Sequence, residues 1–104
     1  MTDILIRAVC DIALLPAASQ SGGRVYASGM RPNHFIRQLG YYVIGQVEFD
    51  GRDSLSTGER AIAKVSFIGD EAFSELARPG FEWDICEGAH TIGVGRIVRL
   101  QPDA

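Results

Sequence analysis

The fold of this chain is decided by residues 80–100, GFEWDICEGAHTIGVGRIVRL. In the first half of this stretch Phe81, Trp83 and Ile85 share one face, and polar or thiol side chains alternate with them. A period of two with large apolar residues on one face predicts a half-buried β-strand. The alternation stops at residues 87–89, Glu-Gly-Ala, and then resumes, so we expect a β-hairpin.

The same alternation recurs in the rest of the chain. Residues 3–14 have one entirely apolar face and one mixed face, which is typical of a sheet with one side on a core. Two further long strands and two short extended segments are predicted, at residues 41–50, 60–68, 24–28 and 33–37. Within residues 41–50, Gly45 interrupts the apolar face, which predicts either a close approach of the backbone or a corner of a barrel.

Turns and one short helix separate these strands. Residues 54–58 have turn composition. Asp70 has the position of an N-cap for a helix of at most two turns at residues 71–77. Short strands at close spacing with almost no helix predict an all-β fold. We expect a small closed antiparallel β-barrel of about six strands with one short helical turn, because closure removes exposed strand edges.

Length and composition indicate one globular domain over residues 1–104. Apolar residues make up 46% of the chain and charged residues 22%, which is ordinary for such a domain. The formal net charge of -3 argues against a generally basic nucleic-acid-binding protein.

The sequence also bears on the cellular location. Cys10 and Cys86 lie among apolar residues, which predicts buried free thiols and fits a reducing compartment, although a disulfide between neighbouring strands is an open alternative. No targeting segment or long apolar run is recognised. We therefore expect a cytoplasmic protein that does not enter a membrane.

Three segments of the sequence carry a family resemblance. They are SGGR at residues 21–24 with SGMRPN at 28–33, TGE at 57–59, and GFEWDICEGAHTIGVG at 80–95. In this order, over nearly the whole chain, they resemble the third, C-terminal β-barrel domain of elongation factor Tu and related translational GTPases. The phosphate-binding G-x-x-x-x-G-K-[ST] loop of those proteins is absent here, so we expect no GTP hydrolysis and no nucleotide or other cofactor.

The resemblance also implies a set of contact residues. In the family this barrel contacts the T-stem backbone of aminoacyl-tRNA and packs against partner proteins. The positions that match RNA- or partner-binding residues are Arg24, Arg31, Asn33, Glu87, Gly88 and His90. Two arginines of the family hairpin are replaced by Cys86 and His90, and each lost cation removes a phosphate contact. This change favours a protein partner over tRNA.

Several other groups of residues have two interpretations. Arg24, Arg31 and Arg37 could form a phosphate-binding strip with Arg96 and Arg99, but solvated arginines paired with acidic residues are the favoured interpretation. The spacing between Cys86 and His90 straddles a turn and supplies no second ligand pair, so no metal site is expected. Tyr41 and Tyr42 point to opposite faces of a strand, so one of them is expected to be an exposed interface anchor.

These observations predict a non-enzymatic binding module. The partner is expected to be a translation-associated protein or a second copy of the chain. One alternative is an RNA-binding module for the acceptor and T-stem region of tRNA. A small enzyme is the least supported alternative, because no catalytic motif is found and no catalytic residues can be assigned.

Overall fold

The computed structural model describes residues 3–16 and 23–101 of the chain. Its elements follow in the order β1 (Ile4–Leu14), β2 (Val25–Ala27), β3 (Asn33–Ile36), β4 (Tyr41–Phe49), β5 (Ser54–Ser56), β6 (Arg60–Gly69), α1 (Glu71–Leu76), β7 (Glu82–Glu87) and β8 (His90–Leu100).

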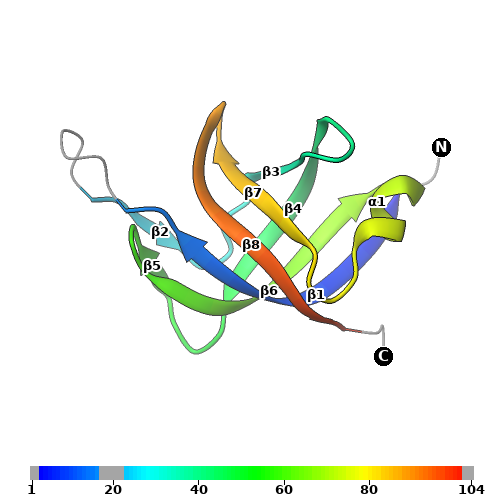
Figure 1. Ribbon diagram of the computed structural model, residues 1–104. Coiled ribbons are helices and arrows are strands. Elements are labelled where there is room, and N and C mark those ends of the chain that lie inside the picture. Colours follow the sequence, from blue (N-terminus) through cyan, green and yellow to red (C-terminus); the bar gives the residue numbers. More distant parts are fainter. Residues whose placement is uncertain (1–2, 17–22, 102–104) are drawn as a thin grey trace.

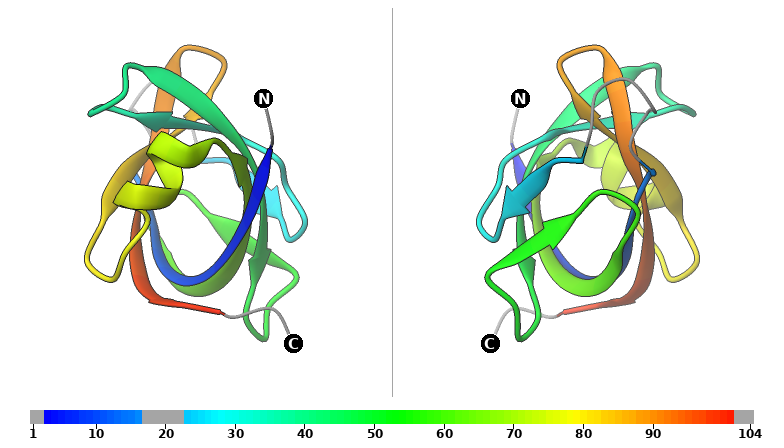
Figure 2. Two further views of the ribbon diagram at one scale, coloured as in Figure 1. Left: turned by 90° about the vertical axis from the view of Figure 1, so that its right-hand side faces the viewer. Right: turned by 90° about the vertical axis from the view of Figure 1, so that its left-hand side faces the viewer.

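Six of the strands form a closed antiparallel barrel in the order β1-β6-β4-β3-β7-β8 (Figure 1). The strands β2 and β5 pair with each other in a separate two-stranded sheet. This small sheet lies at one end of the barrel, and α1 lies at the opposite end (Figure 2). The predicted all-β barrel with one short helical turn is confirmed for the described residues. No helix in this part of the chain is both long enough and apolar enough to cross a membrane.

The hairpin predicted from residues 80–100 is formed by β7 and β8. Glu87 is paired with His90, and Gly88 between them has a φ of 60°, a conformation that glycine adopts without a steric penalty. Farther along the ladder Trp83 is paired with Gly95. A Cβ atom on Gly95 would lie 2.3 Å from the Trp83 ring, so the absence of a side chain on β8 makes room for the indole.

Among the described residues, the buried side chains of the barrel interior are apolar apart from one histidine. Its largest side chains are aromatic: Phe67 lies edge-on to both Trp83 and Phe73, with ring centroids 5.1 and 5.0 Å apart. Phe73 comes from α1 and is fully buried. The N-cap is Asp70, as predicted, and its Oδ1 accepts a hydrogen bond of 2.8 Å from the Phe73 backbone nitrogen. The helix therefore holds an aromatic side chain against the barrel core.

His34 on β3 is the buried histidine, and both of its ring nitrogens are hydrogen-bonded. The Trp83 Nε1–H donates to Nδ1 at 2.9 Å, and Nε2 donates to the Gly45 carbonyl oxygen at 3.0 Å. Burial lowers the pKa of His34 to about 4, so the ring is neutral at pH 7. A Cβ atom on Gly45 would lie 2.8 Å from Nε2, so of the two alternatives at this glycine the structure shows a close approach.

Two details differ from the sequence-based expectations or extend them. Residues 54–58 are not only a turn, because Ser54–Ser56 forms β5 and places the fully buried Leu55 against the core. Cys10 and Cys86 are both buried and free, as expected, and no disulfide joins them. Burial raises the pKa of the Cys10 thiol to about 12.

We predict that the protein loses stability between pH 6.5 and pH 4. A histidine in the unfolded chain titrates near 6.5, whereas the pKa of the folded His34 is about 4. The unfolded state therefore binds more protons in this window, and the free energy of unfolding falls by about 3 kcal/mol as the pH is lowered. Denaturant titrations across this pH range, followed by Trp83 fluorescence, measure the loss.

A matched pair of variants isolates the contribution of His34. His34→Gln keeps one donor and one acceptor but does not titrate, so its pH dependence in this window should be much flatter. The exposed His90 serves as the control, because His90→Gln removes the other histidine but leaves His34 in place, so the loss of stability ascribed to His34 should persist in it. An unchanged slope in His34→Gln would contradict the assignment.

We also predict that Gly95→Ala destabilises the barrel by about 1–3 kcal/mol, the typical cost of overpacking a core. The added methyl group would collide with the Trp83 indole. Urea denaturation of Gly95→Ala in the wild-type and in a Trp83→Leu background measures the coupling. The penalty should shrink when the ring is removed, and an equal penalty in both backgrounds would show that the indole is not the obstacle.

Candidate functional site

A small cavity lies beside the turn of the β7–β8 hairpin and contains most of the residues that the family resemblance implies. Its volume is about 240 Å³, and we call it the hairpin-end cavity. It is lined by Tyr26, Met30, Arg31, Pro32, Asn33, Cys86, Glu87, Gly88 and Ile92. Two pairs of predicted contact residues that are far apart in the sequence are therefore brought together, Arg31 with Asn33 and Glu87 with Gly88.

Strand pairing explains this convergence. Asn33 is the first residue of β3 and is paired with Cys86, next to the hairpin turn. Arg31 and Pro32 precede β3, so they reach the same end of the barrel. The side chain of Arg31 is exposed and makes no ion pair with any residue in the described part of the chain. It is the cation of this cavity that remains available to a ligand.

Arg24, in contrast, is already paired. Its guanidinium donates to Oε1 of Glu87 in a salt bridge, and its backbone nitrogen donates to the Thr57 hydroxyl at 3.3 Å. Hydrogen bonding to Tyr26 and the negative charge of Glu87 raise the pKa of Arg24. The pair neutralises two of the predicted contact residues. Of the motif at residues 21–24, Ser21 and Gly22 lie outside the described residues.

The other predicted arginines do not form a continuous cationic strip. Nη2 of Arg37 donates to both carboxylate oxygens of Asp84, at 3.0 and 3.1 Å. Arg96 on β8 stands opposite Asp11 on β1 and Glu82 on β7. His90 is exposed, lies across the turn from Glu87, and does not line the hairpin-end cavity. The interpretation of these arginines as residues compensated by acids therefore fits Arg24 and Arg37.

The alternation predicted an exposed side chain at one of Tyr41 and Tyr42, and the structure exposes both. Tyr41 is the first residue of β4, and its hydroxyl donates a hydrogen bond to Oδ2 of Asp70. That bond raises the pKa of Tyr41 and lowers the pKa of Asp70. Tyr42 packs its ring 5.2 Å from that of Phe35. Tyr41 is thus hydrogen-bonded to the N-cap of α1, and Tyr42 has the more exposed side chain of the two.

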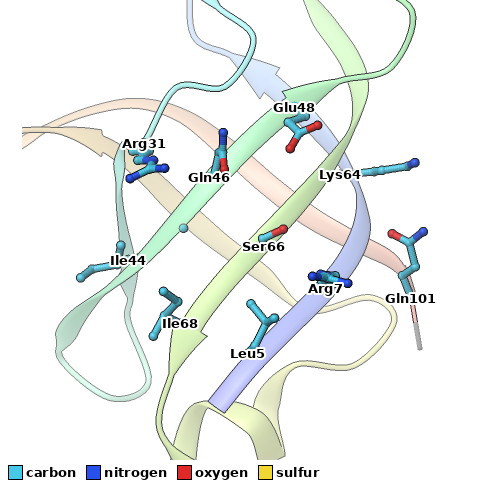
Figure 3. Close-up of a pocket in the computed structure, with 11 residues that line it drawn as sticks. Leu5, Arg7, Arg31, Ile44, Gln46, Glu48, Lys64, Ser66, Ile68 and Gln101 are labelled. Carbon is cyan, nitrogen blue, oxygen red and sulfur yellow. The ribbon is translucent and has the colours of Figure 1, made fainter. Parts of the chain in front are cut away.

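A larger hollow lies on the outer wall of the barrel, across β1, β6 and β4 (Figure 3). Its volume is about 600 Å³, and we call it the outer groove. It is lined by Leu5, Arg7, Arg31, Ile44, Gly45, Gln46, Glu48, Lys64, Ser66, Ile68 and Gln101. Arg31 belongs to both hollows and stands between them.

The strand register arranges the groove in rows. Ile68 on β6 is paired with Leu5 on β1 and with Ile44 on β4, which gives an aliphatic row across three strands. Ser66 is paired in the same way with Arg7 and Gln46, and Lys64 is paired with Glu48. Along the strands the aliphatic row is therefore followed by a mixed row that contains Arg7 and then by the row of Lys64 and Glu48, and Figure 3 shows these side chains.

Its aliphatic row is unusually exposed for such large side chains. The accessible fractions are 45% for Leu5, 47% for Ile68 and 65% for Ile44. Sequence reasoning missed this site, because it assigned Leu5 and Ile44 only to the mixed faces of their strands. The sequence did contain a sign of this site, namely apolar residues on otherwise polar strand faces. That these residues form one row follows only from the strand register.

The described residues contain no group of three or more His, Cys, Asp and Glu side chains that could hold a metal ion. Both nitrogens of His34 are occupied by hydrogen bonds inside the barrel. The pKa of about 12 at Cys10 keeps that thiol protonated and unreactive at pH 7. The outer groove presents an aliphatic row with charged side chains beside it.

Comparison with models of known protein families gives no match, and comparison with curated proteins gives none either. The resemblance to the elongation factor Tu barrel therefore rests on the sequence motifs alone.

Proposed function

We propose that this protein is a non-enzymatic binding module that recognises another protein through the outer groove. The observation that carries the proposal is the aliphatic row formed by Leu5, Ile68 and Ile44. Single exposed apolar residues are common, but a contiguous row on a barrel wall is typical of an interaction surface. Covering these side chains in a complex would remove their apolar surface from water, which stabilises the complex.

The resemblance to the elongation factor Tu barrel supports a partner from the translation machinery. In the multidomain relatives such a barrel packs against other proteins and domains. A reducing cytoplasm, in which translation takes place, also fits two buried free cysteines. These points support the proposed setting and leave the identity of the partner to experiment.

The proposal predicts a protein partner whose capture depends on the aliphatic row. Tagged wild-type protein should be cross-linked in its native lysate after nuclease treatment, and the bound proteins should be quantified. A stoichiometric partner should be lost in Ile44→Asp and in Ile68→Asp, because each places an unpaired charge in an apolar contact. Val25→Asp is the control, since Val25 is 67% exposed and lies outside the groove. Retention of the partner in both groove variants would contradict the proposal.

A second candidate function is binding of a tRNA-like stem at the hairpin-end cavity. The observation in its favour is that Arg31 and Asn33 converge there with Glu87 and Gly88, although the two pairs are distant in the sequence. The Arg24–Glu87 salt bridge weighs against it, because it compensates one of the few cations at that end.

RNA binding, if present, should be weak, salt-dependent and sensitive to Arg31. Filter-binding measurements with unmodified tRNA at low salt should then show a loss of about three- to tenfold in Arg31→Ala, as expected when one phosphate contact is removed. Glu87→Gln should strengthen binding by releasing Arg24 from its partner. The absence of any tRNA binding at low salt would eliminate this candidate.

A further inference from the structure

We infer that the segment recognised by the outer groove is an acidic amphipathic helix of the partner protein, an inference that rests on the proposed function. The groove offers an aliphatic row at one end and cations near it, and the two features together select both the shape and the charge of the occupant.

The length of the aliphatic row matches the spacing of residues on a helix. Neighbouring strands lie about 4.8 Å apart, so the row from Leu5 through Ile68 to Ile44 spans roughly 10 Å. On an α-helix, residues i and i+7 are about 10.5 Å apart and share a face with i+3 and i+4. A helix that crosses the three strands can therefore place one aliphatic side chain over each residue of the row.

The charges of the groove select an acidic partner. Arg31 stands beside β4, and Lys64 lies four residues from Ile68 on β6, roughly 13 Å along the strand. Glu48 is the only carboxylate among the described lining residues. This local excess of cations contrasts with the net charge of -3 of the whole chain. Carboxylates on the flank of a docked helix would face Lys64 and Arg31, while its aliphatic side chains cover the row.

The same composition disfavours a nucleic acid as the occupant. Stacking of bases requires aromatic side chains, and none of the described residues that line the groove is aromatic. The aliphatic row is itself exposed, and a phosphate backbone gains nothing from covering apolar side chains.

A pair of synthetic helices tests the inference. The probe is a labelled peptide of about 18 residues with leucines at i, i+4 and i+7 and glutamates on the flanks, and its counterpart has lysines in place of the glutamates. Fluorescence anisotropy should show that the acidic peptide binds at least about tenfold more tightly than the basic one, with the difference reduced by salt.

Matched variants locate the binding. Ile68→Ser should weaken binding of the acidic peptide about tenfold, whereas Ile62→Ser should leave it unchanged. Ile62 lies on the same strand, is 44% exposed against 47% for Ile68, and does not line the groove. Lys64→Glu should weaken binding about tenfold, and Arg78→Glu, the same charge change outside the groove, by less than about twofold. Ile44→Ser repeats the test at a second position of the row, and Trp83 fluorescence checks that each variant is folded.

Several outcomes would overturn the inference. Two concern the peptides: equal binding of the acidic and the basic peptide, or binding that does not respond to Ile68→Ser and Ile44→Ser. Two concern another occupant: an RNA hairpin that binds through Lys64 more tightly than the acidic peptide does, or a concentration-dependent dimer that Ile68→Ser dissociates. If neither peptide binds but the cross-linked partner is still lost in Ile68→Asp, the helix is wrong and the binding-module proposal stands. If no protein partner is captured at all, the proposed function itself fails.

Discussion

The hydrogen bond from Trp83 to His34 is the interaction on which the barrel depends. It joins β7 to β3, and the second bond of His34 continues to the Gly45 carbonyl on β4, so one imidazole ring links three neighbouring strands inside the barrel. Two aromatic rings of this size fit only because Gly45 and Gly95 have no side chains. In this arrangement the histidine is neutral, and the ring nitrogens of His34 and Trp83 are all hydrogen-bonded within an apolar interior.

The packed interior also determines what the outer wall presents. Because side chains alternate along a strand, the inward positions of Val65 and Phe67 force Lys64, Ser66 and Ile68 outward on β6. The register of the closed barrel then aligns these residues with those of β1 and β4 in rows. The aliphatic row and the charges beside it are therefore a consequence of the same ladder that closes the core, and the stable barrel holds them in fixed positions.

Much of this fold could be predicted from the sequence, because period-two alternation identifies strands that bury one face. The alternation at residues 80–100 predicted the observed hairpin, and the interruption at Gly45 predicted the observed close approach as one of two alternatives. β5 was missed because three residues, Ser54 to Ser56, are too few for a period to be seen, although Leu55 is fully buried. His34 was not predicted to be buried, since its partners Trp83 and Gly45 are distant in the sequence. The outer groove was missed for the same reason, as only strand register unites Leu5, Ile68 and Ile44.

The most direct test of the account is hydroxyl-radical footprinting of the protein bound to the partner captured from its native lysate. If the outer groove is the binding surface, oxidation of Leu5, Ile44 and Ile68 should fall on complex formation, while oxidation of Val25 at the far sheet stays unchanged. Protection of Val25 and of the hairpin-end cavity, with the aliphatic row still fully oxidised, would contradict the account and move the interface to the end of the barrel.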